Sequence, residues 1–317
     1  AKPFRMPDFF MISGLFLGLV ISRPWLRYID RKVVHFAYFY VLWMTIQFAA
    51  KAPQWLGEGQ TLAEVLQFWA VSLVQPFGTL WFIYMLPIFF IVTRLIKRVP
   101  WFITLGFAAI LEILPIHTGW LLVDEFASRY VYFLAGYMFA ANIFRLADWT
   151  QKNAKIAILG LIVWAVINGI LTFTPVPEMI TDGLGLEAGS IYLSDLPLVS
   201  LALGAAGAVA IILTTTLLSN MKWSAFLAYI GRNSIVVYLA FFLPMAVTRI
   251  ILLKFAPFLD IGTVSALVTL AAVSGPIILH LMINWTGYGK FLFERPSWAV
   301  IDRPKATKTG PSLQPAE

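Results

Sequence analysis

Residues 6–40 read MPDFFMISGLFLGLVISRPWLRYIDRKVVHFAYFY, and this stretch decides the fold because it joins two apolar runs through a short basic elbow. The first run covers residues 9–21, and the second begins at residue 33 and continues to residue 50. The elbow holds four cations and a single acid, which are Arg23, Arg27, Arg31, Lys32 and Asp30. Because Lys and Arg concentrate in the cytoplasmic loops of membrane proteins, the stretch predicts two spanning helices joined by a tight cytoplasmic turn.

The composition places the whole chain in a membrane. Hydrophobic residues make up 60% of it and charged residues 12%, and the mean hydropathy is +0.82. A soluble domain averages about 25% charged residues, and it could not bury so much apolar surface. The predicted fold class is therefore all-α, a polytopic bundle of transmembrane helices in a lipid bilayer.

Successive apolar runs predict nine spans in this chain. They cover residues 9–21, 33–50, 77–96, 100–116, 128–146, 156–174, 196–218, 224–253 and 263–285. Residues 62–75 are too short and polar to span, and we expect them to lie along the membrane interface. Bends are expected at Gly231 and at Gly275-Pro276, since Gly and Pro weaken helices.

The cations orient this bundle. With the elbow in the cytoplasm and sides alternating from there, most of the 23 Lys and Arg fall inside, and only six fall outside. The six are Lys2, Arg5, Lys51, Arg129, Arg249 and Lys254. The excess of cations thus has a topological explanation, and we expect no nucleic-acid partner.

This orientation puts Ala1 outside, with no signal sequence to carry it there. We therefore expect an additional upstream span, which would give ten in the full protein, with a nine-span protein as the alternative. The expected domains are a transmembrane domain over residues 1–305 and a disordered cytoplasmic tail over residues 306–317.

Four stretches carry a resemblance to a known family. They are PFRMPDFFMISGLFLG (residues 3–18), RKVVHFAYFYVLW (31–43), FGTLWFIYMLPIFF (77–90) and YIGRNSIVVYLAFF (229–242). In this order and spacing they resemble membrane acyltransferase family 3, whose members are integral-membrane O-acyltransferases. The resemblance implies transfer of an acyl group, such as acetyl, from cytoplasmic acyl-CoA to a hydroxyl of a cell-surface or periplasmic glycan, in the inner membrane of a bacterium.

Two departures from the family matter for the chemistry. His35 stands where the family often has a second Arg, and Phe241 stands where it often has a His. The family's catalytic His and an accompanying Arg would lie upstream of Ala1. The catalytic residue is therefore unassigned within this chain, and His35 is the fallback candidate.

A helix starting at Pro24 would place Arg27, Arg31, His35 and Tyr38 on one face, at spacings of four, four and three. Such a face suits the phosphates of acyl-CoA, because Lys and Arg bind phosphate through charge-assisted hydrogen bonds. The acyl-CoA-binding candidates are Arg27, Arg31, Lys32 and His35. The plain alternative is a topological anchor in which Asp30 pairs with a neighbour.

The candidates for binding the glycan acceptor are Arg5, Trp81, Glu112 and Arg129. An acid at membrane depth is costly, so Glu112 should face a cavity or a partner. Trp81 could stack on a sugar ring or belong to an interfacial aromatic belt. Arg5 and Arg129 could equally be ordinary interfacial charges.

No bound cofactor and no metal are expected, and acyl-CoA would be a co-substrate. The chain has no Cys, and its three His are far apart in sequence. The alternative function is a secondary transporter of a small solute with Glu112 or His280 as its coupling site. That class is disfavoured by the lack of an inverted repeat or of matched broken helices.

Cysteine labelling tests the topology, since this protein has no Cys of its own. Single cysteines at positions 98, 152 and 222 should react only with reagent on the cytoplasmic side, and one at position 182 only with reagent outside. Labelling of position 182 from the cytoplasm alone would overturn the orientation.

Overall fold

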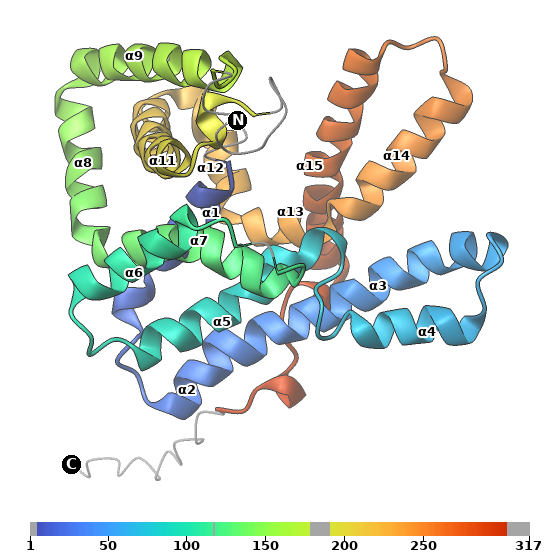
Figure 1. Ribbon diagram of the computed structural model, residues 1–317. Helices are drawn as coiled ribbons and strands as arrows, with labels where there is room; N and C mark the ends of the chain where they lie inside the picture. The colour runs from blue at the N-terminus through green and yellow to red at the C-terminus, as the bar shows by residue number, and fades with distance from the viewer. Residues whose placement is uncertain (1–4, 117, 178–190, 303–317) are drawn as a thin grey trace, which may run out of the picture.

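The computed structural model describes residues 5–116, 118–177 and 191–302, with only the backbone of Arg5 included. Helices and short helical turns make up nearly all of this part of the chain, and its one isolated β-bridge joins Pro175 and Tyr192. The predicted all-α fold class is thus confirmed (Figure 1).

The N-terminal half contains eight α-helices and a π-helical turn. They are α1 (Arg5–Leu15), α2 (Trp25–Ile29), the π turn η2 (Asp30–Val34), α3 (His35–Gly57), α4 (Leu62–Val71), α5 (Trp81–Leu95), α6 (Trp101–Ile113), α7 (Leu121–Met138) and α8 (Ala140–Lys152). The C-terminal half contains α9 (Ala154–Phe173), α11 (Pro197–Ser219), α12 (Ala225–Arg232), α13 (Ser234–Ala240), α14 (Phe242–Phe255) and α15 (Ile261–Thr286). The short 3-10 turns are η1 (Leu17–Leu19), η3 (Gly78–Leu80), η4 (Leu193–Asp195), η5 (Lys222–Ser224), η6 (Lys290–Leu292) and η7 (Ser297–Ala299).

Helices α3 and α5 form an antiparallel pair that runs through the bundle (Figure 1). Aromatic contacts hold it along its length. The ring centroids of Phe36 and Phe90 lie 5.7 Å apart, and those of Tyr40 and Tyr84 lie 4.9 Å apart. In these contacts the later residue of α3 meets the earlier residue of α5. The start of α3 therefore lies beside the end of α5.

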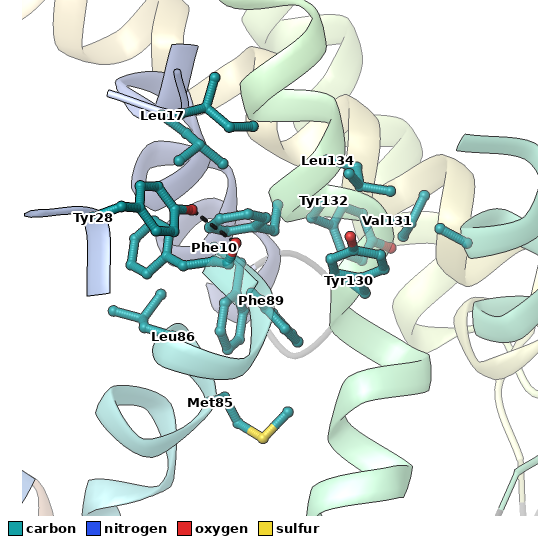
Figure 2. Close-up of a cluster of buried hydrophobic side chains, with 14 residues drawn as sticks. Phe10, Leu17, Tyr28, Met85, Leu86, Phe89, Tyr130, Val131, Tyr132 and Leu134 are labelled. Carbon is teal, nitrogen blue, oxygen red and sulfur yellow. Dashed lines mark hydrogen bonds between the residues drawn. The ribbon is translucent and has the colours of Figure 1, made fainter. Parts of the chain in front are cut away.

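Helix α1 packs into the largest hydrophobic cluster beside this pair. Phe10 is fully buried, with ring centroids 4.8 Å from Phe82 and 5.0 Å from Phe89. Figure 2 shows Phe10 and Phe89 in the middle of this cluster, with Tyr28 and Tyr132 beside them. The hydroxyl of Tyr28 donates to the main-chain oxygen of Phe90 at 2.7 Å, which ties the elbow to α5.

The crossing of α1 and α7 depends on two glycines. A Cβ atom at Gly14 would lie 2.1 Å from the main-chain oxygen of Phe133, and one at Gly136 would lie 2.0 Å from that of Met11. Small residues allow membrane helices to approach this closely, with van der Waals contact and weak Cα–H···O bonds as the gain. Any side chain at these positions would push the two backbones apart.

The count of nine spans is not confirmed. Among the residues that the structure describes, five helices are long and apolar enough to cross a membrane, and α13 with α14 would make a sixth if the pair, bent by 51°, is one span. The six include the expected spans at residues 33–50, 77–96, 156–174, 196–218 and 263–285 and the end of the one at 224–253. The eighth span therefore breaks around Phe241 as well as near Gly231, and α15 continues through Pro276 as one helix.

The other three expected spans are short or divided. Helix α6 has 13 residues and rises about 20 Å, less than the roughly 30 Å of a bilayer core. Helix α1 has 11 residues and ends at a 3-10 turn. The expected span at residues 128–146 is divided between α7 and α8 by a non-helical residue, Phe139. Apolar length in the sequence thus overstated the helical length.

The outer helices present apolar side chains on their exposed surfaces. Helix α9 has the highest mean hydropathy of the five candidate spans, yet only 6% of its most apolar stretch is buried. Helices α14 and α15 form a hairpin that rises away from the α3–α5 pair (Figure 1). Since water would disfavour such surfaces, they are the faces that lipid covers.

Polar caps begin two of the helices. Thr61 and Glu64 form a capping box at α4. At α15 the carboxylate of Asp260 accepts the amide of Thr263 at 2.9 Å, and the hydrogen bonds from Thr263 lower the pKa of Asp260. Helix α4 returns alongside α3 as a short apolar helix, and its expected interfacial placement stays a prediction.

Several expectations lie outside the described residues. They concern Lys2, the side chain of Arg5, His117, the loop around Asp182 and the tail at residues 306–317.

Alanine substitution at the crossing glycines should destabilise the protein. Gly14→Ala and Gly136→Ala should each lower the free energy of unfolding by about 1–3 kcal/mol, the usual cost of overpacking. Gly160→Ala is the matched control, because a Cβ there would meet nothing within 4 Å. Thermal unfolding in detergent measures the effect, and equal melting temperatures for the Gly136 and Gly160 variants would contradict this crossing.

Candidate functional site

The elbow folds as a helix with one wide turn. Pro24 precedes α2, and the main-chain N–H of His35 donates to the oxygen of Asp30, five residues earlier. This π turn lies between Arg27 and His35, so the regular α-helical spacing expected for that face is wrong here. π turns inside helices occur frequently at functional sites.

Arg31, Lys32 and His35 form what we call the cationic face. Arg31 is exposed, and the ammonium of Lys32 lies 4.6 Å from the ring centroid of Phe90. His35 is half-buried, with its ring edge against Phe36 and Phe39. Arg295, Lys32 and Arg31 all act on His35 electrostatically, and the carboxylate of Asp30 acts on it in the opposite sense. The structure thus brings these three predicted residues together.

Arg27, the fourth predicted member, points elsewhere. Its guanidinium lies 3.8 Å from the carboxylate of Asp302, and its side chain is 55% exposed. An exposed pair at this distance contributes little to stability, so Arg27 can exchange this partner for another anion.

Arg94 anchors the start of the elbow to α5. Its guanidinium carbon lies 4.1 Å from the ring centroid of Trp25 and 4.3 Å from that of Tyr28. It also donates to the main-chain oxygen of Arg23. These cation–π contacts are strong when desolvated, and Arg94 is only 6% exposed. Arg94 lies near the end of the expected span at residues 77–96, and its contacts show that it is a packing residue.

Asp30 anchors the end of the elbow to a distant segment. Its carboxylate forms a 2.7 Å ion pair with Arg295, and the two side chains are 0% and 6% exposed. The alternative in which Asp30 pairs with a neighbour is therefore right, although the partner lies far along the chain.

A cavity of about 460 Å³ lies at the opposite end of α5. We call it the aromatic cavity, after the residues Phe9, Trp81, Phe82, Tyr238 and Phe241 that line it together with Thr79. The sequence singled out Trp81. Phe9 of α1, Tyr238 of α13 and Phe241, between α13 and α14, could not be assigned to the cavity because they are distant in sequence.

Two buried polar groups beside this cavity lack partners in the described part of the chain. The hydroxyl of Thr79, on the wall, accepts and donates no hydrogen bond. The amide of Gln47, which is 1% exposed and lies near Gly78, likewise has neither its oxygen nor its nitrogen paired. Because unpaired buried polar groups are costly, these suit a polar ligand or ordered water in the cavity.

The cationic face and the aromatic cavity lie at the two ends of one helix. Phe90, which contacts Lys32, and Trp81 are nine residues apart on α5, or about 14 Å along its axis.

Glu112 and Arg129 lie elsewhere and do not line this cavity. Glu112 accepts hydrogen bonds from the hydroxyls of Tyr132 and Ser200, each at 3.4 Å, and so joins α6, α7 and α11. Arg129 pairs with Glu125 at 3.1 Å. Glu112 and Arg129 thus have their partners away from the aromatic cavity, although Oε2 of Glu112 is buried and has no hydrogen-bond partner among the described residues.

His280 also has an ordinary partner, the amide of Asn284 at 3.3 Å. Among the described residues, no three His, Cys, Asp or Glu side chains gather closely enough to hold a metal ion.

Comparison with known proteins bears on this arrangement. A family model described as an acyltransferase domain matches residues 1–283 of the 317-residue chain. No curated protein and no solved structure matches it. The matched segment contains the cationic face, α5 and the aromatic cavity, and it ends within α15. The chain therefore belongs to acyltransferase family 3 and is a membrane-spanning member of that family.

Proposed function

We propose that this protein transfers an acyl group, such as acetyl, from cytoplasmic acyl-CoA to a hydroxyl of a glycan at the outer side of a bacterial inner membrane. The observation that carries the proposal is the pairing of a cationic face with an aromatic cavity at the two ends of α5. The family supports acyl transfer and so favours this function over the transporter considered from the sequence.

The cationic face would bind the donor. Coenzyme A carries phosphates, and Arg31 is exposed and forms no ion pair among the described residues. Lys32 is the neighbouring cation, and its ammonium lies over the ring of Phe90. Arg27 can add a third contact by leaving Asp302. Charge-assisted bonds to phosphate would then hold the donor by its anionic end.

The aromatic cavity would bind the acceptor. Sugars present apolar ring faces and hydroxyl groups, and the cavity offers the matching pair of surfaces. Trp81 supplies a flat ring, and Thr79 supplies a hydroxyl without a partner in the described residues. Specific sites of this kind combine apolar walls with a few placed polar groups.

The reaction requires the acyl group of a donor bound at the cationic face to reach an acceptor bound in the aromatic cavity. The acceptor oxygen attacks the thioester carbon, the C–S bond breaks, and a base takes the hydroxyl proton. The separation of about 14 Å along α5 is one that the extended arm of coenzyme A can bridge. Within the described residues, His35 is the imidazole on the cationic face and remains the candidate for handling a proton there.

Removing a cation of this face should weaken donor binding. Arg31→Ala and Lys32→Ala should each cost about 1–3 kcal/mol of binding free energy, the value of a lost charge-assisted contact. Titration of the detergent-solubilised protein with acetyl-CoA measures it. Lys222→Ala, which removes an exposed cation of the same predicted side, is the control. If both variants bind acetyl-CoA as the parent does, these residues are topological anchors.

Shortening Trp81 should affect the acceptor alone. An aromatic contact contributes about 0.5–1.5 kcal/mol beyond its buried area, so Trp81→Ala should raise KM for the glycan by at least 2–10-fold. The affinity for acetyl-CoA should stay unchanged, because the cationic face lies at the other end of α5. Trp285→Ala, at a side chain 88% exposed, is the matched control. An unchanged KM for Trp81→Ala would remove the cavity as the acceptor site.

A further inference from the structure

Residues 288–302 follow α15 and lie beyond the end of the family match at residue 283. We call this segment the C-terminal strap. It passes beneath α3 and ends near α2 (Figure 1). Although it contains only the short turns η6 and η7, it is firmly attached to the helices it crosses.

Hydrogen bonds attach the strap to α3. The indole of Trp43 donates to the main-chain oxygen of Leu292, and the hydroxyl of Tyr38 to that of Phe291, each at 3.0 Å. The ring centroids of Trp43 and Phe293 are 5.7 Å apart. Further along the strap, the ring centroid of Trp298 lies 6.1 Å from that of Tyr38, so the later part of the strap approaches the elbow.

At the elbow the strap closes around Asp30. One nitrogen of Arg295 donates to the carboxylate and the other to the main-chain oxygen, each at 2.7 Å. The main-chain N–H of Ile301 donates to the second carboxylate oxygen at 2.8 Å. The same main-chain oxygen of Asp30 accepts the π-turn bond from His35. Both carboxylate oxygens and the main-chain oxygen of Asp30 therefore accept hydrogen bonds. These bonds clamp Asp30, the first residue of the π turn, in place.

This clamp has a consequence for the cationic face. Asp30 is adjacent in sequence to Arg31, and the two interact electrostatically. If the Asp30 carboxylate were unpaired, it would attract Arg31 and Lys32, the same cations that would bind a phosphate of the donor. Arg295 neutralises Asp30 from the side of the strap, and its own side chain is 6% exposed with both terminal nitrogens engaged.

We propose that Arg295 is a positioning residue of the donor site, which keeps the Asp30 carboxylate away from Arg31 and Lys32 and holds the π turn that presents them. The strap is thus part of the wall of the site. This inference rests on the proposed binding of an acyl-CoA at the cationic face. Because the Arg295 side chain is 6% exposed and both of its terminal nitrogens donate to Asp30, it acts through Asp30 and makes no contact with the donor.

Two substitutions with opposite expected effects test this role in the full chain. Arg295→Gln leaves the Asp30 carboxylate unpaired, so the affinity for acetyl-CoA should fall at least tenfold. Asp30→Asn removes the competing charge and keeps both the main-chain oxygen for Arg295 and a side-chain oxygen for Ile301. Its affinity for acetyl-CoA should equal or exceed that of the parent protein.

The double variant Asp30→Asn/Arg295→Gln isolates the mechanism. If Arg295 acts only through the charge of Asp30, the double variant should bind acetyl-CoA within threefold of the parent protein. Arg232→Gln is the matched control, since it removes an exposed arginine at the end of α12. Titration of the detergent-solubilised proteins with acetyl-CoA gives all five affinities, and size-exclusion chromatography shows which variants are folded.

The outcomes separate this inference from the proposed function. Unchanged affinity in Arg295→Gln overturns the positioning role, and so does a double variant as weak as Arg295→Gln. If Arg295→Gln does not fold, Asp30→Asn decides, because a tenfold loss there shows that the pair only maintains the fold. If the parent protein binds no acetyl-CoA, the proposed donor site fails and the inference falls with it.

Discussion

The contact between α3 and α5 is the one on which the rest of the structure depends. The aromatic rings of Phe36, Tyr40 and Phe48 face α5 or the residues just before it in antiparallel order, and the two largest hydrophobic clusters meet along this pair. Because the helices are antiparallel, the basic start of α3 lies beside the end of α5, and the cavity at the start of α5 lies at the far end. Both candidate sites are thus consequences of one packing interaction.

The elbow shows how a cluster of like charges is held in a folded protein. Two distant arginines hold its backbone in place without offsetting its positive charge. Arg94 of α5 lies against the rings of both Trp25 and Tyr28, and Arg295 of the strap pairs with Asp30. Breaking a buried pair by removing one partner is costly because the remaining charge stays desolvated. Three cations of the elbow, Arg23, Arg31 and Lys32, form no ion pair within 4 Å among the described residues.

Buried polar groups at membrane depth differ here in how far they are paired. Oε1 of Glu112 accepts from two hydroxyls and so joins three helices, whereas its Oε2 is buried without a partner in the described residues. Gln47 and Thr79 have buried polar atoms without partners, next to a cavity. Sequence alone ranks Glu112 above both, because a carboxylate is the more conspicuous residue in an apolar run. Position beside the aromatic cavity, rather than residue type, makes Gln47 and Thr79 the candidate ligand groups.

The sequence by itself determined the membrane class, the all-α fold, the family and the cationic elbow, because apolar run length, charge position and short motifs are local properties. It overstated the spans at α1, α6 and α7, since a run of apolar residues does not show where a helix ends. Only the tertiary structure decided that Asp30 pairs with Arg295, that Trp81 shares a cavity with Tyr238, and that Glu112 lies apart from it. These facts join residues from distant parts of the chain, and such contacts are set by how the helices pack, which no local pattern records.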